Sequence, residues 1–168
     1  TSSTITFCAN LHPSIQLSVL DQSRPTRASI LDSMNLWITI AKEELIEAME
    51  RVDIVVINDG EATMLSGNDN LVQAAKDVQA MASIPILIIK KGEHGVLALH
   101  GDQIVALPAF PTNLVVDPTG CGDTFAGTLA TCLAAGSGPI EIEELQNALI
   151  HATVSASFTL QGFGIKGL

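Results

Sequence analysis

Hydrophobic positions along this chain follow two different spacings. Short, nearly continuous apolar runs occur at residues 53–58 (Asp-Ile-Val-Val-Ile-Asn) and 84–90, as is typical of strands buried on both faces of a parallel sheet. Between such runs the apolar residues recur at helical spacing. In residues 41–51, for example, the glutamates and the larger apolar side chains fall on opposite faces of a helix. The chain therefore alternates between strand and helix patterns.

These patterns and their boundary residues predict a series of elements. Pro13 suits the first turn of a helix, Gly67 ends one, and Gly101-Asp102 forms the turn of a hairpin. The expected strands are 4–8, 27–31, 53–58, 84–90, 95–99 and 103–106, and the expected helices are 13–22, 41–51, 61–66, 70–82, 124–135 and 142–160. This alternation predicts an α/β fold, an open and mostly parallel sheet with helices on both faces.

Length and composition limit the class of protein. A chain of 168 residues with 47% hydrophobic residues can bury a core, and we expect a single domain over residues 1–168. The formal net charge of −10 argues against nucleic-acid partners and against anionic membrane surfaces. Two stretches without charged residues, Thr124–Ile140 and Leu145–Ile165, are interrupted by polar residues, so we interpret them as buried helices rather than membrane spans.

The three cysteines have no metal-binding spacing, and three thiols cannot all pair with one another. A reducing, cytoplasmic setting is therefore expected.

Residues 117–127 (Asp-Pro-Thr-Gly-Cys-Gly-Asp-Thr-Phe-Ala-Gly) carry the most specific chemical pattern. Its glycines allow a sharp turn, and the helix behind it offers unpaired N–H groups to a phosphate. Asp123 places a carboxylate beside that site, where it could accept a proton from an attacking hydroxyl. The pattern favours phosphoryl transfer to an alcohol. The alternative is an aspartate that caps an ordinary buried helix.

The same segment resembles the second signature of the PfkB (ribokinase-like) carbohydrate kinases, D-T-x-G-A-G-D-x-F-x-G. Cys121 departs from the small residue usual at its position. The resemblance implies an ATP-dependent kinase that acts on a sugar or nucleoside by direct in-line transfer. Asp123 would be the base, and the backbone N–H groups of Gly120, Cys121 and Gly122 would stabilise the transferred phosphoryl group.

Two further patterns occur in the order that the family has. Asn58 and Glu61 match its N-x-x-E motif, which is tied to Mg²⁺; by themselves they favour a simple helix start, but their place upstream of the glycine turn favours the magnesium site. Lys90, Gly92 and Gly95 match its K-x-G-x-x-G turn, which lies along the nucleotide. For that turn the alternative is a solvated hairpin.

The resemblance also implies roles for less specific positions. Asp117 and Thr119 match a site for a monovalent cation such as K⁺, with Pro118 in place of the commoner Thr. Asn147 and His151 lie on the helix that borders the adenine pocket, although His151 alone reads more readily as a buried core histidine. Asp32 follows a strand and is expected to cap a turn.

The resemblance covers only the later part of the family, without its N-terminal strands and β lid. We therefore expect a partial PfkB domain that is inactive as an isolated chain. A non-catalytic nucleotide-binding fragment, a degenerate paralogue and a lidless kinase of the vitamin-precursor type are the alternatives. A strand at residues 4–8 with one open side would favour a homodimer through the N-terminal edge.

Overall fold

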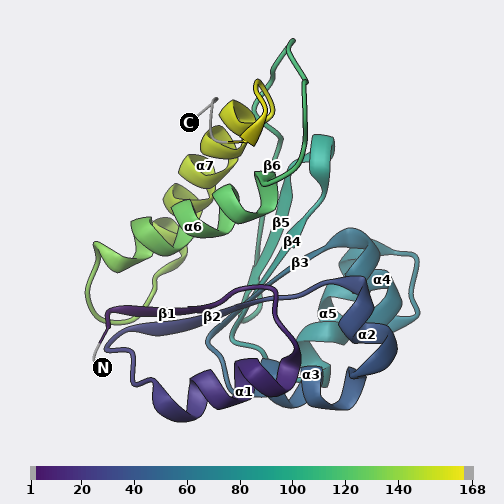
Figure 1. Cartoon of the computed structure of the whole chain (residues 1–168), viewed down its shortest axis with the longest axis vertical. Helices are drawn as coiled ribbons and strands as arrows, with labels where there is room; N and C mark the ends of the chain where they lie inside the picture. The colour runs from purple at the N-terminus through teal and green to yellow at the C-terminus, as the bar shows by residue number, and fades with distance from the viewer. Residues whose placement is uncertain (1–2, 165–168) are drawn as a thin grey trace.

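The computed structural model describes residues 3–164, which form one sheet with helices packed on both faces (Figure 1). The strands are β1 (Ile5–Cys8), β2 (Ala28–Asp32), β3 (Ile54–Asn58), β4 (Ile86–Lys90), β5 (Val96–His100) and β6 (Gln103–Leu107). The helices are α1 (Pro13–Gln22), α2 (Asn35–Ile40), α3 (Lys42–Glu50), α4 (Asp59–Ser66), α5 (Leu71–Met81), α6 (Cys121–Ala134) and α7 (Ile142–Thr159), and residues Gly92–His94 form a short 3₁₀ turn.

The strands lie in the order of the sequence, from β1 to β6. Neighbouring strands from β1 to β4 are parallel, whereas β5 pairs antiparallel with both β4 and β6. This arrangement confirms the predicted α/β fold and mostly parallel sheet, and the β5–β6 hairpin accounts for the antiparallel part.

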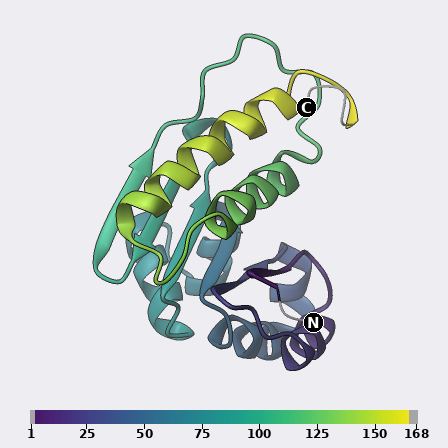
Figure 2. The ribbon, with the colours of Figure 1, turned by 90° about the vertical axis from the view of Figure 1, so that its left-hand side faces the viewer.

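Alternate residues of the central strands supply two separate cores. Leu31, Val55 and Leu87 face α1 to α5, while their neighbours Ile30 and Ile54 face α6 and α7. Figure 2 shows the same division, with α6 and α7 across the sheet from the five earlier helices. Because both faces are covered, the apolar runs read as continuous in the sequence.

Two differences from the expected elements are larger than a shift of one or two residues at an end. Helix α2 was not predicted, because its six residues, Asn-Leu-Trp-Ile-Thr-Ile, are too few to show a helical period. Helix α6 begins at Cys121 rather than at residue 124, because Gly120 takes a left-handed conformation (φ 85°) and the helix starts directly after it. This earlier start places Asp123 inside the helix.

No helix within residues 3–164 combines the length and the apolar character that crossing a membrane requires. The second uncharged stretch ends at Ile165, which lies outside the described residues.

The carboxyl ends of β2, β3 and β4 meet at one edge of the sheet, and the N-terminus of α6 is held beside them. Thr159 on α7 donates a hydrogen bond to the Thr124 hydroxyl on α6 (2.9 Å), and Val116 N–H donates to the Leu160 carbonyl (2.7 Å). These bonds fix the glycine turn between the end of α7 and the sheet edge.

Candidate active site

The start of helix α6 presents unpaired backbone donors. Cys121 N–H donates to the Pro118 carbonyl (3.2 Å), and Thr124 N–H donates to the Gly120 carbonyl (2.9 Å). Within residues 3–164, no backbone or side-chain acceptor takes a hydrogen bond from the N–H of Gly120 or Gly122. Two of the three predicted N–H groups are therefore free to bind an anion at the positive end of the helix.

Asp123 is the third residue of α6 and its side chain is exposed. The residue at the N-cap is Gly120, so the interpretation of Asp123 as a helix cap is wrong. Its carboxylate is free to act on a neighbouring group.

The loop before the glycine turn is held by Asp117, which is partly exposed. Its Oδ1 accepts a hydrogen bond from Thr119 N–H (2.9 Å), and this bond lowers the pKa of the Asp117 carboxyl. Burial and the Asp117 charge raise the pKa of the Cys121 thiol. The thiol is therefore protonated near neutral pH and is not poised as a nucleophile.

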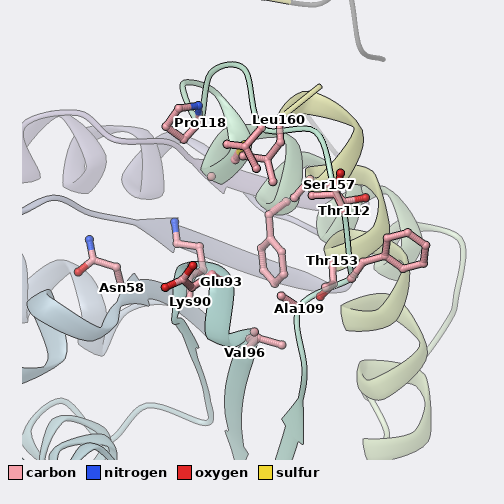
Figure 3. A pocket seen from close by; sticks show the side chains of 18 of the residues that line it. Asn58, Lys90, Glu93, Val96, Ala109, Thr112, Pro118, Thr153, Ser157 and Leu160 are labelled. Atoms are coloured by element: carbon pink, nitrogen blue, oxygen red, sulfur yellow. The ribbon is translucent and has the colours of Figure 1, made fainter. Parts of the chain in front are cut away.

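A cavity of about 830 Å³ opens beside the glycine turn. Figure 3 shows Asn58, Lys90 and Glu93 on one side of it, and Thr153, Ser157 and Leu160 of α7 on the other. Its other walls come from the start of α4, the end of β4, the 3₁₀ turn, the loop after β6 and the first turns of α6. The residues that line the cavity also include Asp59, Gly92, Gly95, Val96, Ala109, Phe110, Pro111, Thr112, Val115, Pro118, Cys121, Gly122 and Phe125.

Lys90, the last residue of β4, forms an ion pair with Asp32, the last residue of β2 (Nζ to Oδ1, 3.2 Å). The pair spans the end of β3, which lies between them. Asp32 also accepts a hydrogen bond from Ser33 N–H (3.0 Å), as the expected turn cap would. The sequence showed no signal for the ion pair, because it depends on which strands become neighbours.

Asn58 and Glu61 form a reciprocal capping box at the start of α4. The Asn58 side chain accepts from Glu61 N–H (2.8 Å), and the Glu61 carboxylate accepts from Asn58 N–H (2.7 Å). Glu61 is only 2% exposed, and burial raises its pKa to about 7. The helix-start interpretation is therefore confirmed, and the pair is also rich in the oxygen donors that suit Mg²⁺.

The two glycines of the K-x-G-x-x-G turn have different surroundings. Gly92 is exposed, opens the 3₁₀ turn with φ 54° and lines the cavity. Gly95 is buried with φ 91°, and a Cβ there would lie 2.0 Å from the Leu107 carbonyl oxygen. Close packing against the end of β6 therefore requires glycine at position 95, whatever the cavity binds.

The structure does not bring Asn147 and His151 to the cavity. Both side chains are exposed on α7, so the interpretation of His151 as a buried core residue is wrong. Four residues with helical spacing turn toward the cavity instead: Thr153, Ala156, Ser157 and Leu160. Their spacing was visible in the sequence, but only the fold shows which face of α7 borders a cavity.

Comparison with known proteins identifies the family of this chain. The model of the pfkB family carbohydrate kinases matches residues 18–166. The chain is 39% identical over 88 residues to a cytidine kinase of Thermococcus kodakarensis, a match that covers 51% of this chain and 31% of that protein. It is 31% identical over 135 residues to a bifunctional ribokinase/ribose-5-phosphate isomerase A of Fructilactobacillus sanfranciscensis, covering 75% of this chain and 23% of that protein.

The fold resembles that of a fructokinase from Vibrio cholerae solved with fructose, ADP and calcium ion. The TM-score is 0.81 at 16% identity, over 98% of this chain and 56% of that one. The chain thus spans a little over half the length of this solved kinase and a third or less of the two curated relatives. Since the family model matches most of the sequence and the fold agrees with it, the chain belongs to the PfkB family of carbohydrate kinases.

Proposed function

We propose that this chain is the ATP-binding and catalytic part of a kinase that phosphorylates an alcohol group of a sugar or nucleoside. One observation carries the proposal: the free N–H groups of Gly120 and Gly122, the Lys90 ammonium and the Asp123 carboxylate are brought together at one sheet edge beside a cavity. An anion-binding helix start next to a base is the arrangement that phosphoryl transfer to a hydroxyl needs.

In the proposed reaction Asp123 accepts the proton of the acceptor hydroxyl. The acceptor oxygen forms a bond to the γ-phosphorus of ATP while the bond from that phosphorus to the bridging oxygen breaks, leaving ADP. The N–H groups of Gly120 and Gly122 donate to the phosphoryl oxygens, whose negative charge the Lys90 ammonium also offsets. The resemblance also assigns the Cys121 N–H to the phosphoryl group. This N–H donates to the Pro118 carbonyl and would have to break that hydrogen bond before it could bind a phosphate.

The residues at the start of α4 fit a magnesium ion. Asn58 and Asp59 line the cavity, and Glu61 lies buried directly behind them with one carboxylate oxygen outside the capping box. Asn58 and Glu61 would hold Mg²⁺ through oxygen atoms or bound water, and the ion would offset phosphate charge.

We also propose a K⁺ site at Asp117 and Thr119. It is supported by the Asp117 carboxylate, whose lowered pKa keeps it charged.

We propose that the nucleotide base lies in the deep part of the cavity, between the loop at Phe110 and the face of α7 that carries Thr153 and Ser157. This wall is largely apolar and has two hydroxyl groups that could fix an aromatic base. Asn147 and His151, which were expected at the adenine, are exposed on α7 and could meet only an outer part of a ligand.

The similar proteins act on sugars and nucleosides, as the names ribokinase, fructokinase and cytidine kinase state, and this supports the same acceptor class here. We propose that the 168-residue chain alone has negligible turnover, because the Asp123 carboxylate is exposed to water that a catalytic site excludes. A second copy of the chain is the proposed partner.

The free thiols of Cys8, Cys121 and Cys132 support a reducing, cytoplasmic setting.

Asp123→Asn tests the function. In the longest natural form of the protein, this variant should lower kcat for transfer from ATP to a sugar or nucleoside by ~10²-fold or more, because the general base is lost. Its affinity for Mg-ATP, measured by calorimetry, should be nearly unchanged. Glu143→Gln is the matched control, because the Glu143 side chain is exposed in the first turn of α7, and this variant should keep full kcat. An unchanged kcat in Asp123→Asn would refute its role as the general base.

A further inference from the structure

The ion pair between Asp32 and Lys90 lies within the proposed site, and although Lys90 belongs to the K-x-G-x-x-G turn, Asp32 belongs to none of the motifs found in the sequence. Its two side chains leave the ends of β2 and β4 and meet over the end of β3, with Nζ and Oδ1 3.2 Å apart. The Asp32 side chain is 8% exposed and that of Lys90 is 21% exposed. A nearly buried carboxylate therefore holds the Lys90 ammonium, and Lys90 also lines the cavity.

The Lys90 ammonium also lies against the first turn of α6. A Cβ built on Gly122 would lie 3.4 Å from Lys90 Nζ, an ordinary van der Waals distance, so the ammonium is close to the start of the helix. Two positive groups, the ammonium and the end of the helix dipole, converge on this point. Such a convergence is unfavourable unless an anion lies between them or a carboxylate offsets them, and Asp32 is the carboxylate that does so here.

The Lys90 ammonium has donor hydrogens that form no hydrogen bond among the described residues. Among the described residues, its only hydrogen bond is the one to Asp32, whereas an ammonium can donate three. Its remaining donors and the free N–H of Gly122 therefore border the same space. A phosphoryl group at this point would meet both.

We infer that Lys90 binds the terminal phosphoryl group of ATP and that Asp32 is a positioning residue, which aims the Lys90 ammonium at the start of α6. This inference rests on the proposed function. It assigns to Asp32 a role in orienting Lys90 for the transferred group, in addition to capping the turn at Ser33.

Nucleotide titrations of the 168-residue chain test this assignment. Calorimetry with Mg-ATP and Mg-ADP should show that Lys90→Gln weakens ATP binding by ~10-fold or more, because a charge-assisted hydrogen bond is lost. The same change should leave ADP binding nearly unaltered. Asp32→Asn, which keeps the shape but removes the charge, should weaken ATP binding by several-fold with the same selectivity for ATP over ADP.

The double variant Asp32→Asn/Lys90→Gln should bind ATP no more weakly than Lys90→Gln alone, since Asp32 acts through Lys90. Asp53→Asn and Lys76→Gln, which lie away from this edge, are the matched controls. Additive losses in the double variant, an equal loss for ADP, or unchanged ATP binding by Asp32→Asn would each overturn the inference while leaving the proposed function intact. Failure of the wild-type chain to bind either nucleotide would overturn both.

Discussion

At the scale of single residues, Glu61 has a role in folding and also a place in the proposed magnesium site. It completes the capping box of α4, yet burial raises its pKa to about 7 from the usual 4.5. The groups that face it are Lys90, which lowers the pKa, and Asp32 and Asp59, which raise it. A carboxyl that is close to half protonated near neutral pH would lose its proton when a cation binds.

This pKa sets a dependence of stability on pH. Because the pKa of Glu61 is raised on folding, the folded state binds its proton more tightly than the unfolded state does. Its contribution to stability is complete below pH 4.5 and is lost as the pH rises through about 7.

Without divalent ions, we therefore expect the wild type to lose about 1–3 kcal/mol of unfolding free energy between pH 5 and pH 8, relative to Glu61→Gln. Urea unfolding of both proteins at each pH measures this difference. Glutamine can still accept the bond from Asn58 N–H, so the helix cap is kept. Parallel pH profiles of the two proteins would contradict the raised pKa.

At the scale of elements, the sequence predicted most helices and strands because buried parallel strands and amphipathic helices leave strong patterns. Helix α1 begins and ends where it was expected, and Gly67 ends α4 in a left-handed conformation as predicted. The short helix α2 left no such pattern. The predicted residues of the glycine turn lie together at the sheet edge, whereas the partnership of Asp32 with Lys90 follows from strand order, which no local pattern encodes.

Helix α7 is tied to the sheet by an ion pair at the edge away from the site. Arg27, just before β2, donates to both carboxylate oxygens of Glu144 (2.8 and 2.5 Å) and also to the carbonyl of Leu133. The Arg27 side chain is only 3% exposed, so removing its partner would leave a charge poorly solvated.

We expect Glu144→Gln to lower the unfolding free energy by about 1 kcal/mol, a modest loss because Glu144 is itself partly exposed. Thermal and urea denaturation would measure it. Glu143→Gln, a neighbour in the same first turn of α7 with no ion pair among the described residues, should have little effect. Equal stability of the two variants would show that the Arg27 ion pair contributes nothing to the packing of α7.

At the scale of the whole molecule, the sheet has one open side at β1. Within the described residues β1 pairs only with β2, and its other side offers free backbone donors and acceptors. Next to this edge, α1 exposes Ile15 and Val19, and Leu11, two residues before the helix, continues this apolar stripe at a spacing of four residues. An edge strand beside apolar surface is suited to pairing with a second copy.

We therefore predict concentration-dependent self-association of the chain, detectable by sedimentation as a dimer. Ile15→Glu should shift the equilibrium toward monomer by placing a charge on the stripe. Val72→Glu, on α5 and similarly exposed (45% against 49% for Ile15), is the control and should not. A stable monomer at high concentration would refute the proposed contact.

The central claim is that ATP phosphates bind where the start of α6 meets the carboxyl ends of the strands. Amide NMR spectra of the chain during titration with Mg-ATP to millimolar concentration test it most directly, because each backbone N–H reports its own surroundings. We predict saturable shifts that are largest at residues 120–123 and 90–95, with little change at Asp53, Gly101 and Glu144 on the opposite edge. Saturable shifts confined to that opposite edge, or no shifts in a folded chain, would contradict the account.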